Sequence, residues 1–142
     1  MFLIGVFLAY LLMMLGCIYA GLSPLEVIDI PSILIVFFPT LILGYFSNRA
    51  QFFPAFKNLI SGGEYSELDR AAHAGIFKVM GKISLGSGWL GVMIGAIAML
   101  KNLGKGDLSA WGVGCAAALI TILYGYGFTY LFCVPAANKV KG

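Results

Sequence analysis

The chain has 142 residues, of which 61% are hydrophobic and only 11% are charged, and its mean hydropathy is +0.96. A soluble globular domain is typically about half apolar and about a quarter charged, so this composition excludes an ordinary soluble domain and indicates an integral membrane protein. The formal net charge of +3 comes from scattered basic residues without a basic face or an interleaved aromatic platform, so we expect no nucleic-acid partner.

The first apolar stretch is predicted to be a retained transmembrane helix over residues 2–21. Residues 12–17 (LMMLGC) faintly resemble a lipoprotein cleavage box, but no Lys or Arg precedes them, and a signal peptide requires a charged start. The three cysteines, Cys17, Cys115 and Cys133, lie in apolar segments without a CxxC pair or a nearby His or acidic residue. We expect them to be small apolar packing residues.

Four apolar stretches have the length of membrane spans, because a bilayer core about 30 Å thick needs about 20 helical residues. Asp29 can cap the second of them, and Pro31 suits its first turn, where a backbone N–H would have no partner. The chain is therefore expected to be an all-α, single four-helix membrane domain. Its predicted spans are residues 2–21, 31–46, 83–100 and 111–137, and its main loop is 47–82.

The distribution of Lys and Arg predicts the orientation in the membrane, because these residues concentrate on the cytoplasmic side. The termini and the loop at 47–82 contain most of them, and the two short connectors contain only Lys101 and Lys105. We therefore expect both termini and this loop in the cytoplasm. The residues on the predicted cytoplasmic side are Arg49, Lys57, Arg70, Lys78, Lys82, Lys139 and Lys141.

The loop has its own pattern. Residues 51–60 (QFFPAFKNLI) are apolar and aromatic and are expected at the membrane interface, and residues 61–63 predict a turn. Residues 64–82 have apolar positions at helical spacing, so the third helix is expected to extend into the cytoplasm as one piece. His73 could relay protons, but without a partner in the sequence it is expected to be a solvated helix residue.

None of the four predicted spans contains Asp, Glu, Lys, Arg or His. Ionisable groups inside a membrane are usually functional, and a stand-alone proton-coupled transporter would be expected to carry at least one. No nucleophile–base, metal-ligand or phosphate-binding pattern occurs either, so no catalytic residue, metal site or cofactor is predicted, and the chain is not expected to be an enzyme. Either the chain does no ion chemistry, or the titrating group belongs to a partner.

Glycines line one face of the third span. Gly91 and Gly95 form a GxxxG pair and Gly88 lies one turn earlier, so helix backbones can approach closely along this face. The face can pack against other helices of the same chain or against another subunit. Small residues on two consecutive helices favour another subunit.

The fourth span carries a matching stripe. Ala118, Thr121 and Gly125 lie at i, i+3 and i+7, which gives a narrow smooth face with a hydroxyl. The Thr121 hydroxyl either faces a partner or bonds the carbonyl four residues earlier in its own helix, and both alternatives are open. Pro135 lies near the end of this span, just before its polar exit.

Three stretches resemble motifs of the MotA/TolQ/ExbB family of ion-driven motor subunits, and the MotA branch most closely. Residues 29–36 (DIPSILIV) are similar to the start of the second MotA span. Residues 88–103 (GWLGVMIGAIAMLKNL) are similar to the pattern G-x-x-G-T-x-x-G followed by M-L-x-N-L. Residues 118–139, beginning ALITILYG and ending PAANK, are similar to A-L-L-T-T-L-Y-G followed by P-x-A-x-K. The resemblance covers most of the chain from Asp29 on.

The resemblance implies a bacterial inner-membrane subunit that assembles as a homopentamer. In the family the pentameric ring encloses a dimeric, single-span partner of the MotB/ExbD/TolR kind, whose helix carries the aspartate that accepts the ion. The third and fourth helices line the interior of the ring, and ion passage drives its rotation. A titrating group on the partner agrees with the absence of Asp, Glu, Lys, Arg and His from the four predicted spans.

Two family threonines are replaced here, by Val92 and Ile122, and the loop is too short for the domain that meets a flagellar rotor. The resemblance therefore implies a minimal proton-motive-force-driven 5:2 motor for another machinery, or alternatively a non-conducting scaffold. The expected partner-facing residues are Thr121, Ala118, Gly125, Ile122, Val92, Gly88, Gly91 and Gly95, and the structural ones are Asp29, Pro31 and Pro135.

Overall fold

The computed structural model describes residues 2–23, 25–62, 65–102 and 108–142, and all of its regular elements in these ranges are helical. Within these described ranges, four helices are long and apolar enough to cross a membrane, as predicted. In chain order the elements are α1 (Phe2–Tyr19), α2 (Ile30–Ser47), α3 (Arg49–Ser61), α4 (Glu67–Asn102), α5 (Leu108–Gly127), the π-helical turn η2 (Phe128–Cys133) and α6 (Val134–Lys141).

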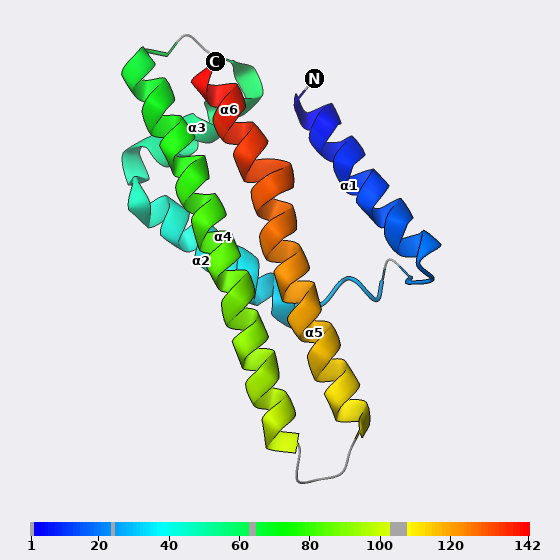
Figure 1. The fold of residues 1–142 in the computed structure, drawn as a ribbon. Helices are drawn as coiled ribbons and strands as arrows, with labels where there is room; N and C mark the ends of the chain where they lie inside the picture. Colours follow the sequence, from blue (N-terminus) through cyan, green and yellow to red (C-terminus); the bar gives the residue numbers. More distant parts are fainter. Residues whose placement is uncertain (1, 24, 63–64, 103–107) are drawn as a thin grey trace.

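The molecule is organised around a long antiparallel pair of helices (Figure 1). One member is α4, whose 36 residues span about 54 Å at 1.5 Å per residue. The other is the continuous run of α5, η2 and α6. α4 starts well before residue 83, which confirms the extension of the third helix beyond its span. α2 lies behind the pair in the view of Figure 1, and both termini and α3 lie at one end, here called the terminal end.

The loop predicted at 47–82 is mostly helical. α3 ends at Gly62, which adopts a left-handed conformation with φ of 60° and donates its N–H to the carbonyl of Asn58. Glycine suits this capping position because it has no Cβ. Phe52, Ala55 and Leu59 turn inward from α3. The rest of the predicted turn, Gly63, and the predicted helix start, Glu64, lie outside the described residues, as do residues 103–107 of the α4–α5 connection.

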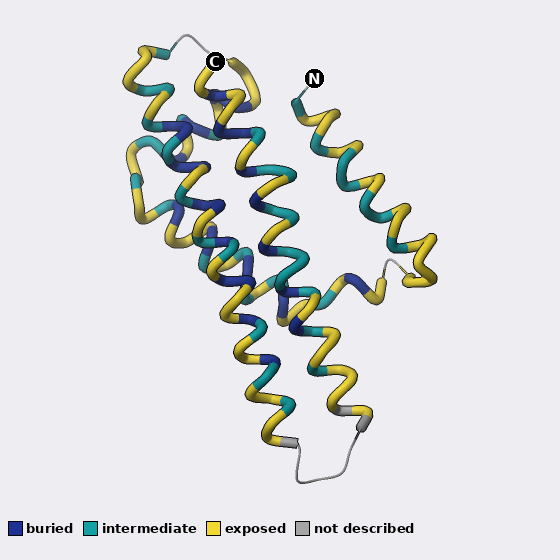
Figure 2. Tube along the Cα trace, viewed as in Figure 1, coloured by how far each residue is buried: buried dark blue, intermediate teal, exposed yellow. Residues whose placement is uncertain are grey.

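The hydrophobic core lies at the terminal end, where α3, the start of α4, η2 and α6 meet. Figure 2 shows buried residues gathered there and along the line of contact between α4 and α5. Burial at this end fixes α3 and α6 against α4, although neither is long enough to cross a bilayer. The cluster consists of Phe52, Ala55, Leu59, Ala74, Ile76, Phe77, Met80, Cys133, Ala136, Ala137 and Val140.

His73 belongs to this end of the molecule, and the expectation of a solvated residue is wrong. Its side chain has no exposed surface. Nε2 lies 2.8 Å from Oε1 of Gln51 and Nδ1 lies 3.2 Å from Nδ2 of Asn58, so a neutral ring can donate to Gln51 and accept from Asn58. The ring of Tyr65 covers it edge-on at 5.0 Å. α3 folds back over α4 and supplies the two amides that the sequence pattern of α4 did not reveal.

Because burial lowers the pKa of His73 more than the nearby Asp69 raises it, we expect acid to weaken this end of the fold. The unfolded chain takes up a proton near the ordinary pKa of 6.5, whereas the folded chain resists it, so the stabilisation is complete above that pH and is lost as pH falls below it. The free energy of unfolding in detergent should fall between pH 7 and 5, by at most about 1.4 kcal/mol per pH unit. His73 is the only histidine. Equal pH dependence in His73→Gln would contradict the assignment.

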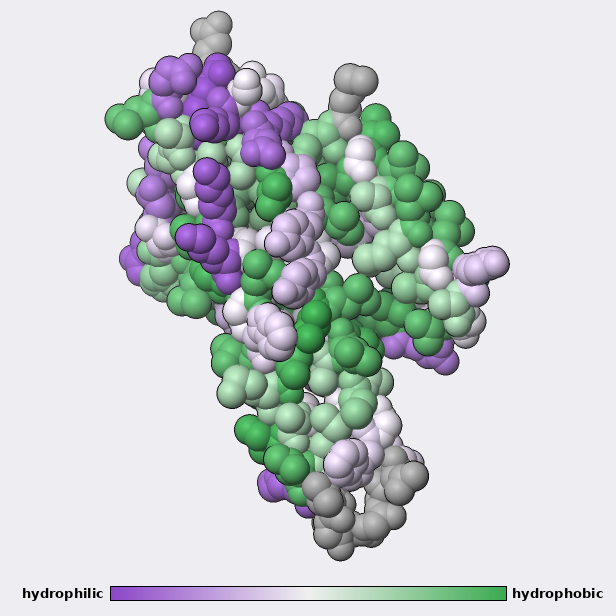
Figure 3. Space-filling model, in the orientation of Figure 1, coloured by the Kyte–Doolittle hydropathy of each residue, from purple (hydrophilic) through white to green (hydrophobic). Residues whose placement is uncertain are grey.

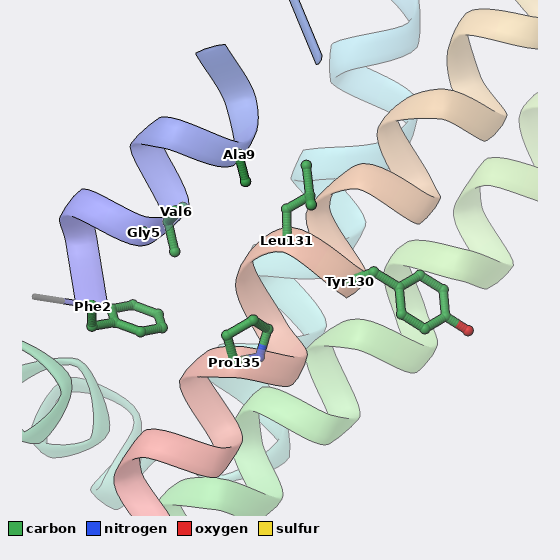
Figure 4. Close-up of a pocket in the computed structure, with 7 residues that line it drawn as sticks. All are labelled: Phe2, Gly5, Val6, Ala9, Tyr130, Leu131 and Pro135. Atoms are coloured by element: carbon green, nitrogen blue, oxygen red, sulfur yellow. The ribbon is translucent and has the colours of Figure 1, made fainter. Parts of the chain in front are cut away.

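α1 stands apart from the other helices and has no buried residue. Among the described helices it contacts η2 and α6, near its own start. There the Phe2 ring lies 6.4 Å from the Phe132 ring and 5.2 Å from the ammonium group of Lys139. Figure 4 shows the small residues Gly5 and Ala9 on the side of α1 that faces η2 and α6, across a groove of about 300 Å³. α1 is thus attached at one end and diverges from α5 at the other (Figure 1).

Candidate functional site

The glycine face of α4 packs against α5 of the same chain. A Cβ added to Gly91 would lie 2.6 Å from the Thr121 side chain, and one added to Gly95 would lie 3.0 Å from Cβ of Ala118. From the other side, a Cβ on Gly125 would lie 2.8 Å from the Ser84 carbonyl oxygen. Only glycine allows backbones this close, and this line of contact is here called the seam.

Within a single chain these residues pack against one another, which is the first of the two alternatives that the sequence leaves open. Ala118 and Thr121 are buried within a single chain, at 7% and 2% exposure. The small-residue faces of α4 and α5 have complementary shapes, and the two helices are antiparallel neighbours in the chain. The faces therefore pack against each other and need no second subunit. The residues placed in the seam rather than on an outer surface are Gly88, Gly91, Gly95, Ala118, Thr121 and Gly125.

Thr121 uses its hydroxyl inside its own helix. Oγ1 donates to the carbonyl of Ala118 at 2.8 Å, three residues earlier rather than four. Its methyl and Cβ fill the space opposite Gly91. Thr121 is thus a packing residue of the seam with an internally satisfied hydroxyl.

Val92 and Ile122 occupy a different side of the helix pair. α2 contacts α5 through Phe37, whose ring lies 6.0 Å from that of Tyr124, and it contacts α4 near Met80. At 100° per residue, Ile122 lies about 160° around α5 from Tyr124, and Val92 lies about 120° around α4 from Met80. Both are half-buried. They lie on the side that α2 leaves uncovered, here called the open flank, which Figures 1 and 3 face.

Further hydroxyls in the helix pair escaped the sequence analysis. Thr129 is buried, and its Oγ1 lies 2.9 Å from the Gly81 carbonyl oxygen and 2.8 Å from that of Gly125. Ser84 donates to the Gly125 carbonyl at 3.2 Å. The signal for Thr129 was its spacing, since it follows Thr121 by eight residues and so continues the same face two turns later.

The π-helical turn η2 follows directly from this cluster. The N–H of Val134 bonds to the carbonyl of Thr129, five residues earlier rather than four. Pro135 comes next and has no N–H to donate, so it occupies the first turn of α6. Single π-helical turns inside α-helices are frequent at functional sites. Pro135 also lines the groove towards α1 (Figure 4).

The entry to α2 is fixed by Asp29. Its carboxylate accepts the backbone N–H of Ser32 at 2.9 Å and also the Ser32 hydroxyl, and Pro31 lies in the first turn. The hydroxyl of Tyr124 on α5 donates to the Val27 carbonyl at 2.5 Å. These bonds dock the connector between α1 and α2 against the middle of the helix pair.

Comparisons with known proteins agree with one another on the family and on the fold of this chain. The model of the MotA/TolQ/ExbB proton channel family matches residues 61–142, which include α4, the seam and η2. The chain belongs to the MotA/TolQ/ExbB proton channel family. With four apolar helices it is a multi-pass membrane member of this family. Only α3 and two short connections separate α2 from α4, so it is a short MotA-like member without a large domain inserted there.

Individual relatives agree with this family assignment. The chain is 52% identical over 54 residues to motility protein A of Aquifex aeolicus, covering 38% of this chain and 20% of the relative. It is 35% identical over 67 residues to chemotaxis protein PomA of Vibrio alginolyticus, covering 47% of this chain and 26% of the relative. The matched part thus spans about a quarter or less of either relative.

The fold has a counterpart among solved structures. A chain of the C. jejuni MotAB structure superposes with a TM-score of 0.82 at 18% identity, covering 99% of this chain and 80% of the other. The arrangement of α1 to α6 is therefore the fold of that chain.

Proposed function

We propose that the chain is the ring-forming subunit of a proton-motive-force-driven 5:2 motor in a bacterial inner membrane. Five copies surround a dimer of single-span, MotB-like partners, and an aspartate in the partner helix carries the proton. Both termini and α3 lie on the cytoplasmic side, in line with the excess of Lys and Arg at the terminal end.

The observation that carries the proposal is the absence of Asp, Glu, Lys, Arg and His from the four predicted spans of a proton channel family member. Coupling proton passage to a motor needs a titratable group in the hydrocarbon core that binds and releases the proton. Since the spans offer no such group, a second chain supplies it.

The open flank is the surface that we assign to the partner. The seam is closed by contacts within the chain, and α2 covers the opposite side of the pair. Val92 and Ile122 of the original partner-facing set lie on the open flank, and their aliphatic side chains offer no hydroxyl to a passing ion. The partner's carboxylate and water on the flank then carry the proton alone, which favours H⁺ over Na⁺, since Na⁺ needs several oxygen ligands.

To test the proposal, the chain is purified together with its co-encoded single-span partner and weighed by native mass spectrometry. We expect five copies of the chain and two of the partner. In liposomes the complex should conduct protons, and replacing the partner aspartate by asparagine should reduce the flux more than tenfold. A monomer or dimer that binds no partner would contradict the proposal.

A second function, a non-conducting scaffold of the same family, is favoured by one observation. The two positions where the family pattern has threonine are aliphatic here, Val92 and Ile122. A 5:2 complex that shows no proton flux, with or without the partner aspartate, would support the scaffold and exclude the motor.

A further inference from the structure

A stripe of changing polarity runs along α4 on the open flank. Lys78, Lys82, Leu85 and Trp89 lie at i, i+4, i+7 and i+11, which places them on one face of the helix. Both lysines are exposed, and Trp89 is 55% exposed. The face is therefore cationic towards the terminal end and apolar beyond it. Figure 3 shows hydrophilic residues over this part of α4 and hydrophobic surface further along the pair.

A furrow of about 220 Å³ lies between this stripe and the helix opposite. Its other wall is formed by Tyr130 and Val134, and Figure 4 shows the Tyr130 ring pointing away from α1. The Tyr126 ring stacks on the Tyr130 ring at 5.9 Å, so two tyrosines extend the wall along the flank. The lining residues on which the binding argument depends are Lys78, Lys82, Leu85, Thr129, Tyr130 and Val134.

The charge of the furrow is uncompensated by the protein. Of the residues that line it, the charged ones are Lys78 and Lys82, and no carboxylate is among them. Within the described part of the chain neither ammonium group has an ion pair or a hydrogen bond. The Thr129 hydroxyl on the floor is already bonded to backbone carbonyls. A ligand that fits this furrow therefore carries negative charge next to the two lysines and apolar surface next to Leu85, Tyr130 and Val134.

We propose that this furrow binds an anionic phospholipid. The phosphate lies between the ammonium groups of Lys78 and Lys82, and one acyl chain follows Leu85 and the Tyr130 ring towards the middle of the membrane. Two lysines one turn apart match the phosphate, and tyrosines are typical of the level of the headgroups. The carboxylates of an acidic peptide would match the lysines. Its polar backbone, however, would lie against the apolar part of the furrow, where an acyl chain fits better.

The proposal goes beyond the motor function and does not require the ring, because one chain contains the whole furrow. In the proposed 5:2 assembly, five furrows would face two partner helices. If each partner helix fills one furrow, at least three furrows would remain without a helix. A bound lipid would close these against water.

The experiment uses the full chain in detergent, titrated with short-chain phosphatidylglycerol or phosphatidylcholine, with bound lipid counted by native mass spectrometry. We expect phosphatidylglycerol to bind at about tenfold lower concentration. The double variant Lys78→Gln/Lys82→Gln should lose about tenfold in affinity for it. The matched control Lys57→Gln/Lys101→Gln removes the same charge from exposed positions outside the furrow and should bind as the original chain does.

A competition with inorganic phosphate distinguishes a lipid from a free anion. Millimolar phosphate should not displace phosphatidylglycerol if the acyl chain contributes, and displacement would assign the site to a free anion. Equal binding of the two lipids, or equal losses in the double variant and its control, would overturn the proposal. Leu85→Gln should weaken phosphatidylglycerol binding with both lysines in place, and unchanged binding would also count against it.

Discussion

Replacing Gly91 by alanine is expected to destabilise the protein by about 1–3 kcal/mol, the usual range for overpacking a close contact. The added Cβ would lie 2.6 Å from the Thr121 side chain, a separation that real Cβ atoms do not adopt. Either α4 and α5 separate locally or Thr121 leaves its position. The free energy of unfolding in detergent measures the loss.

A compensating change identifies the contact. Thr121→Gly removes the opposing Cβ and hydroxyl, so we expect the double variant Gly91→Ala/Thr121→Gly to lose less stability than the two single variants together. Gly86→Ala is the matched control on the same helix, because nothing lies within 4 Å of its added Cβ. It should be neutral or slightly stabilising. A Gly91→Ala variant as stable as Gly86→Ala would refute the seam.

Replacing Val92 by tryptophan is expected to reduce proton flux through the complex with the partner more than tenfold while the chain still folds. The larger side chain projects onto the open flank, where we place the partner helix. Ile94→Trp is the matched control, since two residues turn the side chain by about 160° and Ile94 is 52% exposed. Flux is measured in liposomes, and folding by thermal unfolding of the chain without partner.

Equal flux in the two tryptophan variants would remove the open flank from the ion pathway. Ile122→Trp offers a second test from α5. If the flank surrounds the partner, this variant should reduce flux as Val92→Trp does. If Val92→Trp alone unfolds the chain, Ile122→Trp still decides the assignment.

Much of the helical layout follows from the sequence because membrane length and helix caps are local properties. The run of apolar residues defined the spans, and Asp29 with Pro31 marked the start of α2. Which helix packs against a face of small residues is not a local property of the sequence. Gly91 and Thr121 were both recognised as special, yet a period of 3.6 residues defines a face without saying what covers it.

His73 illustrates the same limit in the terminal end. Its burial depends on α3 folding back over α4, a contact between residues far apart in the chain. The available signal was the spacing of Gln51 and Asn58, seven residues apart and hence on one face of α3. Polar residues in an apolar, aromatic segment point to a buried polar partner, and His73 was the candidate on the neighbouring helix.

The seam also has a mechanical consequence. Helices usually meet through a layer of side chains that can change rotamer and absorb strain. Between Gly88 on α4 and Gly125 on α5 there is no such layer, because Cα of Gly125 lies 3.4 Å from the position of a Cβ on Gly88. We therefore expect α4 and α5 to move together as one rigid unit more than 50 Å long, with little sliding or bending between them. We therefore expect a displacement at one end of the pair to be transmitted to α3 and α6 at the terminal end.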